Sequence, residues 1–140
     1  MATPVQLTFD CADPGTQARF WAGALGYVLE PPPGPFQTWD EALAAWGVPE
    51  ELWNSRSAAV DPDGRGPRFF FQQVPEAKVA KNRVHVDIKA GGSGDDRRAR
   101  IDAEVERLQG LGAAVLNPVD EWGSYCVVMQ DPEGNEFCVD

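Results

Sequence analysis

The chain has 140 residues, a length that suits one compact domain and is too short for two ordinary ones. Its formal net charge of −10, from 22 acidic and 12 basic residues, disfavours binding to a phosphate backbone. No apolar run reaches the roughly 18 residues that a membrane span needs, and the first residues lack the basic and apolar regions of a signal peptide. We therefore expect a cytoplasmic protein that binds neither nucleic acid nor membranes.

The first strand and helix are predicted near the N-terminus. Residues 5–11 alternate apolar and polar side chains with period two, which indicates a strand buried on one face. Asp13 and Pro14 then form the expected start of a helix, as N-cap and first helical residue. The helix ends at Gly26, and a second strand begins over 27–29. The apolar set of the first strand is expected to pack on the helices; it comprises Val5, Leu7, Phe9 and Cys11.

An extra segment, residues 37–54, follows in the first half. Thr38 and Glu41 have the spacing of a capping box, which predicts a short helix, and a second helical turn is predicted near residues 49–53. The tryptophans of this segment either pack on the sheet or cover a ligand cleft.

The second half repeats the pattern of the first. Residues 83–90 alternate with period two, with Val84, Val86 and Ile88 expected to face the helices. A helix follows, with Ile101, Val105 and Leu108 on one stripe; it ends within 110–112, and a strand begins at residue 114. Each half then has an Asp-Pro-x-Gly turn, at 61–64 and 131–134, before a strand at 68–74 and 136–139. The sequence thus predicts two modules of strand, helix and three strands.

Several stretches of the chain together resemble the glyoxalase/bleomycin-resistance/dioxygenase superfamily, also called the vicinal oxygen chelate superfamily, and within it the glyoxalase-like domain proteins. These stretches are distributed along nearly the whole chain, at residues 13–27, 66–78, 81–87 and 131–138. The resemblance implies an α+β fold in which two βαβββ modules form curved mixed sheets around a cleft. It places one glyoxalase-like domain over 1–140, with the first module at about 1–74, a linker at 75–81 and the second module at about 82–140. It also implies a homodimer.

Many members of this superfamily hold a divalent metal, with one ligand from the first strand and one from the last strand of each module. On this pattern Gln6 and His85 occupy the first-strand positions, and the resemblance implies a possible zinc, nickel, iron or manganese ion bound by His85, Gln6 and Glu136. The last strands fit less well: Cys138 stands where a glutamate is usual, and Gln72 is a poor substitute for a carboxylate.

Three residues are candidates for catalysis. His85 is the single histidine of the chain, so any histidine acid–base chemistry would use it, with Asp87 or a neighbour to orient the ring. Asp87 and Glu136 could act as acid–base groups if a partly dry cleft raised their pKa. A structural histidine without a catalytic role is the alternative.

Ligand contacts are expected from residues on the cleft side of the sheets and from aromatic side chains near it: Gln6, Thr8, Trp21, Trp39, Phe70, Gln72, Trp122 and Cys138. The leading interpretation is a glyoxalase-like protein that binds a small ligand in its cleft. The alternatives are a metal-dependent lyase, isomerase or dioxygenase, and a protein that serves mainly in assembly. The widely spaced cysteines Cys11, Cys126 and Cys138 predict free thiols.

Overall fold

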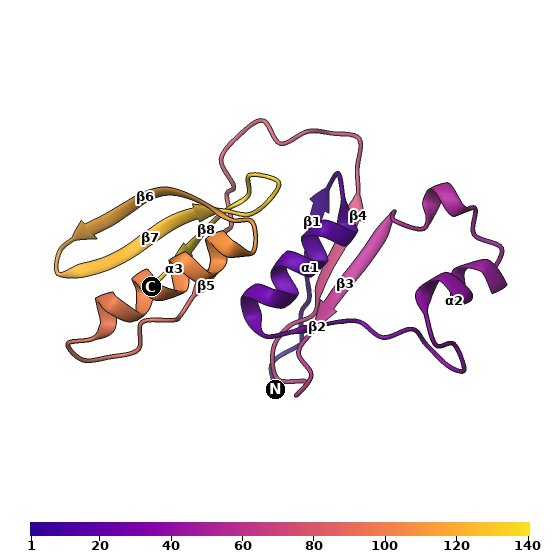
Figure 1. The fold of residues 1–140 in the computed structure, drawn as a ribbon, viewed down its shortest axis with the longest axis horizontal. Coiled ribbons are helices and arrows are strands. Elements are labelled where there is room, and N and C mark those ends of the chain that lie inside the picture. Colours follow the sequence, from indigo (N-terminus) through magenta and orange to yellow (C-terminus); the bar gives the residue numbers. More distant parts are fainter. The chain divides into compact units, whose positions relative to one another are not determined.

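Two four-stranded mixed sheets organise the chain, one in each of two units, Met1–Ala77 and Lys78–Asp140 (Figure 1). The computed structural model describes residues 1–140, and the boundary between the units lies inside the predicted linker. The strand orders are β1-β4-β3-β2 and β5-β8-β7-β6, so the two units have the same topology. This confirms the predicted α+β class and the βαβββ repeat.

The first unit contains one main helix, one short helix and four strands. The outer strand β1 pairs in parallel with β4, and the remaining pairs are antiparallel. The elements in chain order are β1 (Leu7–Cys11), α1 (Pro14–Leu25), β2 (Val28–Leu29), α2 (Trp39–Ala45), a 3-10 turn η1 (Glu50–Leu52), β3 (Arg56–Val60) and β4 (Phe69–Gln73).

The second unit repeats this arrangement without the insertion. Here β5 pairs in parallel with β8, while β6, β7 and β8 are antiparallel neighbours. Its elements are β5 (Asp87–Ile88), α3 (Arg97–Gly110), β6 (Ala114–Glu121), β7 (Ser124–Gln130) and β8 (Glu136–Val139). No helix of the chain combines the length and hydrophobicity that a membrane crossing requires.

Local capping explains where α1 begins and ends. The Asp13 carboxylate accepts hydrogen bonds from the backbone N–H of Thr16 at 3.2 Å and from its hydroxyl at 2.7 Å. Pro14 follows at the first helical position, where no backbone N–H is required. Gly26 ends the helix with φ of 70°, a left-handed conformation that glycine adopts without a steric penalty. All three features agree with the sequence-based prediction.

The inserted helix α2 also forms as predicted. The Thr38 hydroxyl accepts from the Glu41 backbone N–H, and the Glu41 carboxylate accepts from the Thr38 backbone N–H. This reciprocal pair of hydrogen bonds satisfies two backbone donors that the first helical turn leaves free. The predicted second turn is present as η1.

Each sheet has one face against its helix and one open face. In the first unit Cys11, Phe69 and Phe71 are buried on the α1 side, while Thr8 and Asp10 on the opposite side of β1 are exposed. In the second unit the predicted stripe of α3 is buried with the inward residues of β7 and β8: Ile101, Val105, Leu108, Val127, Met129, Phe137 and Val139. Helix burial therefore selects one side-chain set of each strand.

Two valines depart from the predicted packing. Val5 is 74% exposed because β1 begins two residues later, at Leu7. Val84 is 81% exposed because the strand predicted over 83–90 is reduced to Asp87–Ile88, so Val84 precedes the paired residues. The period-two pattern identified which residues share a face, but extended too far toward the N-terminus of both strands.

Candidate functional site

A network centred on Arg68 lies on the open face of the first sheet. The Arg68 guanidinium forms a bidentate ion pair with Glu30, with nitrogen–oxygen distances of 2.7 and 3.1 Å, and donates to the Gln6 side-chain oxygen at 3.0 Å. It also lies 5.0 Å from the centre of the Phe70 ring. Since both members of the ion pair are about one-third exposed, the network is accessible to solvent.

This network changes the chemistry available to Gln6. A metal ion would use the side-chain oxygen of Gln6, and that oxygen already faces the positive charge of Arg68. The Gln72 side chain is held by a different contact, because its amide nitrogen donates to the Asp10 carboxylate at 2.7 Å. The first sheet thus places Gln6, Thr8 and Gln72 on one face, but its amides serve hydrogen bonds within the unit.

Three potential metal ligands come together on the open face of the second sheet. His85 Nε2 lies 3.2 Å from Asp87 Oδ1, and their side chains are 41% and 43% exposed. Asp87 is the register partner of Cys138 in the parallel β5–β8 pair, which brings the Cys138 thiol to the same place. One ligand atom from each of the three residues lies within 4.8 Å of the others. The second unit therefore presents an imidazole, a carboxylate and a thiol together.

The Cys138 thiol is protonated at neutral pH in the absence of a bound cation. Burial raises its pKa to about 11, and the negative charge of Asp87 contributes in the same direction. Because the thiolate is the nucleophilic form of cysteine, Cys138 is a poor nucleophile in this environment.

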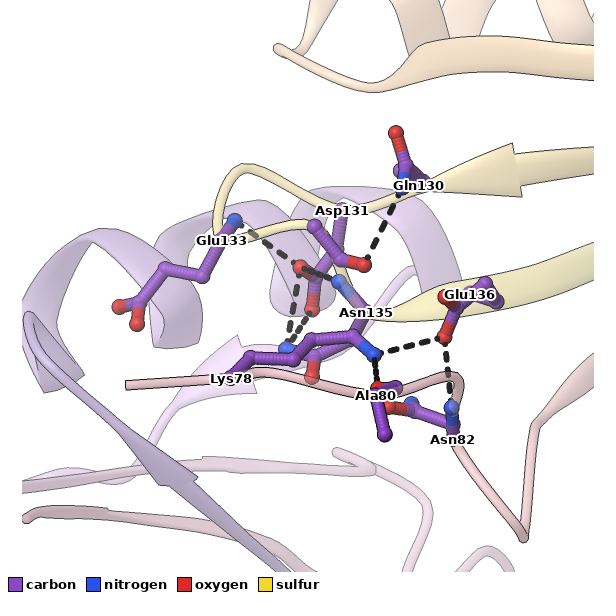
Figure 2. Close-up of polar contacts among 9 residues, drawn as sticks. Lys78, Ala80, Asn82, Gln130, Asp131, Glu133, Asn135 and Glu136 are labelled. Carbon is purple, nitrogen blue, oxygen red and sulfur yellow. Dashed lines mark hydrogen bonds and ion pairs between the residues drawn. The ribbon is translucent and has the colours of Figure 1, made fainter. Parts of the chain in front are cut away.

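Glu136 occupies a different position from the one predicted for a metal ligand. Its carboxylate accepts a hydrogen bond from the Asn82 backbone N–H at 2.9 Å and forms an ion pair with Lys78 at 3.1 Å (Figure 2). Lys78 also donates to the carbonyl oxygen of Ala80. The hydrogen bond from Asn82 is the main cause of a lowered Glu136 pKa, so the raised pKa expected for an acid–base group is wrong. Glu136 anchors the linker instead of joining the three-residue group.

The predicted tryptophan ligands occupy three different environments. Trp21 is 1% exposed and packs between aromatic rings in the core, so it does not line an open surface. Trp39 is 38% exposed, and its indole N–H donates to the Glu30 carbonyl at 2.7 Å. Trp122 is 99% exposed at the β6–β7 turn, with φ of 56°.

The repeated topology allows the two open faces to be compared position by position. Thr8 pairs with Phe70 in the first sheet, as Asp87 pairs with Cys138 in the second. Gln6 lies two residues before Thr8, and His85 lies two residues before Asp87, so Gln6 and His85 occupy corresponding positions in the two units. The positions that carry imidazole, carboxylate and thiol in the second unit therefore carry amide, hydroxyl and phenyl groups in the first. The internal repeat indicates which segments of the two units correspond. The strand register then shows which residues correspond, and so shows this asymmetry.

The fold of this chain is that of a known family. The model of the glyoxalase-like domain matches residues 6–139, and the chain belongs to that family. No curated protein matches the chain in sequence.

Solved structures show the same fold at low sequence identity. A possible glyoxalase from Bacillus cereus has 17% identity and a TM-score of 0.62, with 99% of this chain and 98% of that chain covered. The fosfomycin resistance protein FosX from Mesorhizobium loti has 14% identity and a TM-score of 0.62, with coverage of 99% and 91%. A FosX mutant from Listeria monocytogenes, complexed with Mn(II) and 1S,2S-dihydroxypropylphosphonic acid, has 10% identity, a TM-score of 0.63 and coverage of 99% and 90%.

The donor set determines which metal would fit. Manganese prefers carboxylate and other oxygen ligands, whereas the group in the second unit has one carboxylate beside a nitrogen and a sulfur donor. The Gln6 side-chain oxygen is a poor additional ligand, because the positive charge of Arg68 lies beside it. The group formed by His85, Asp87 and Cys138 fits zinc or another ion of borderline softness, and fits manganese poorly.

Proposed function

We propose that this chain binds a small polar ligand on the open face of its second sheet, at His85 and Asp87. The observation that supports this is the His85–Asp87 pair: the two side chains are 3.2 Å apart and both are more than 40% exposed. A ligand can therefore reach them without displacing core residues. The net charge of −10 favours a cationic or neutral ligand over an anionic one.

A screen of small cationic, neutral and anionic compounds by thermal shift, on chelator-treated protein, tests this proposal. For a compound that binds, His85→Ala is expected to weaken the affinity at least about tenfold, which corresponds to roughly 1.4 kcal/mol. Its melting temperature without ligand should stay nearly unchanged, because His85 is exposed. Asp120→Ala is the control, since it removes an exposed ion pair with Arg98, which is on α3. Equal affinities for wild type and His85→Ala would contradict the proposal.

A metal-dependent lyase, isomerase or dioxygenase is the second candidate function. It is favoured by the convergence of His85, Asp87 and Cys138, since a metal held there would polarise a bound oxygen group of a substrate.

The free thiols also support a reducing, cytoplasmic location for the protein.

We also propose that two chains form a homodimer. The edge strands β1, β2, β5 and β6 each have a row of backbone groups without a strand partner, and such edges are commonly covered by assembly. Light scattering at about 10–100 μM, a range in which weak dimers dissociate, is expected to give twice the 15.3 kDa mass of the chain. A mass of 15.3 kDa throughout that range would overturn the dimer.

A further inference from the structure

Strand pairing in the second unit holds two of the three potential ligands in place. Cys138 lies within β8, Asp87 lies within β5, and the Cys138 backbone N–H donates to the Val86 carbonyl at 3.0 Å. His85 precedes Asp87 by two residues, so both side chains point to the same side of the extended chain. The ladder between β5 and β8 thus fixes the relative positions of the thiol and the carboxylate, and the hydrogen bond at Val86 holds the backbone next to His85.

We propose that His85, Asp87 and Cys138 form a zinc-type metal site contained entirely within the second unit. The site differs from the implied arrangement in two ways: it draws no ligand from the first unit, and it includes a cysteine. Its occupant is a divalent ion of borderline softness, with zinc as the representative. The site lies on the face proposed for ligand binding. Its biological role rests on that proposed function, but its existence does not, because metal binding is measured directly.

The distances are compatible with one ion. Zinc binds nitrogen and oxygen ligands at about 2.0–2.2 Å and thiolate at about 2.3 Å, so tetrahedral ligand atoms lie about 3.3–3.6 Å apart. The His85 and Asp87 atoms are already 3.2 Å apart, and every separation in the group is within 4.8 Å. Side-chain adjustments of about 1 Å therefore suffice to bring all three ligands onto one ion.

The chemistry of the ligands selects the ion. Imidazole and thiolate both suit zinc, and coordination by zinc deprotonates a thiol. Manganese, the ion of the Listeria FosX structure, prefers a set of oxygen donors, of which this group offers one carboxylate. Three protein ligands leave a fourth position available, as in zinc sites that bind water or a small molecule.

The arrangement has no evident role in stability. A solvent-exposed polar contact such as His85–Asp87 contributes little to folding, and the neighbouring half-buried thiol adds no favourable charge interaction with the aspartate. A bound cation would compensate both the carboxylate charge and the thiolate formed on binding.

Titration of the metal-free, reduced chain with zinc, cobalt and manganese tests the site without any organic ligand. Cobalt reports the coordination directly, because a cobalt–thiolate bond gives a charge-transfer absorption in the near ultraviolet. We expect this band in the wild type, and we expect one equivalent of zinc to displace the cobalt. Manganese is expected to bind at least about tenfold more weakly than zinc, because it prefers oxygen ligands. The band is expected to be lost in Cys138→Ser.

Matched variants keep the test specific. His85→Ala and Asp87→Asn should each weaken zinc binding by about 10- to 100-fold or more, the range seen when even the supporting partners of metal ligands are removed. Cys11→Ser is the control, because Cys11 is a buried thiol of the first unit and its replacement should leave zinc binding and the cobalt band intact. Circular dichroism confirms that each variant is folded.

Three results would overturn the site: no zinc binding by the wild type, a cobalt spectrum without the thiolate band, or equal losses in Cys11→Ser and Cys138→Ser. A chain that binds an organic compound through His85 but no zinc would leave the proposed ligand function in place and remove the metal site. A chain that binds zinc but none of the screened compounds would support the metal site and contradict the proposed ligand function.

Discussion

Replacing Trp21 by alanine is expected to lower the free energy of unfolding of the chain by about 3–5 kcal/mol, as for other large aromatic residues removed from a core. Trp21 is 1% exposed, and its ring lies 5.4 Å from that of Phe9, 5.3 Å from Phe20 and 5.6 Å from Phe69. Alanine would leave a cavity against both α1 and the sheet, and would remove all three ring contacts.

Urea denaturation followed by circular dichroism measures this loss. Trp122→Ala is the matched control: the same substitution at a residue that is 99% exposed should change the stability by less than about 0.5 kcal/mol. The comparison also separates two interpretations of Trp21. If Trp21→Ala were as stable as the control, the ring would not belong to the core and a ligand role would be open again.

Much of the fold could be predicted because its signals are local. Asp13, Pro14 and Gly26 fix the ends of α1 through their own hydrogen bonds and backbone angles, whatever packs beside the helix. The pair Thr38 and Glu41 does the same for the start of α2. The strand alternation and helical stripe that recur in the second half, with the two Asp-Pro turns, were sufficient to predict equal topologies for the two units.

The length of the first strands depended on partners that the sequence does not identify. Alternation at residues 83–90 continues through Val84, but β8 pairs with β5 at Asp87 and Ile88. Beyond these pairs an alternating segment has no ladder to extend it. Alternation therefore predicted the side-chain faces better than it predicted the strand boundaries.

The candidate site was also predictable only in part: its residues could be identified from the sequence, but their contacts could not. His85, Asp87 and Cys138 were each identified from the sequence, but their meeting point follows from a parallel register between residues about 50 positions apart in the chain. The role of Glu136 could not be predicted, because its partners Lys78 and Asn82 lie in or next to the linker, which has no regular structure. Such contacts depend on the path of the chain and not on a motif.

Asp131 is the residue whose loss is expected to have the next largest effect, because a buried carboxylate organises the turn before β8. It is 3% exposed and accepts from the backbone N–H groups of Glu133 and Asn135, both at 3.0 Å, and from the Asn135 side-chain amide at 2.9 and 3.1 Å (Figure 2). Asp131→Ala would leave these donors without a carboxylate. Since hydrogen bonds to a charged group contribute about 1.5–3 kcal/mol each and are not additive, we expect a loss of about 2–4 kcal/mol.

The corresponding turn of the first unit provides the comparison. Asp61 accepts from the backbone N–H groups of Asp63, Arg65 and Gly66, but it is only half-buried, so water can replace its carboxylate more readily than that of Asp131. Asp61→Ala should therefore destabilise the chain less than Asp131→Ala in the same urea experiment. Because the Asp131 turn leads directly into β8, Asp131→Ala should also weaken zinc binding at Cys138, whereas Asp61→Ala should not. Equal destabilisation by the two substitutions would show that burial does not distinguish the two turns.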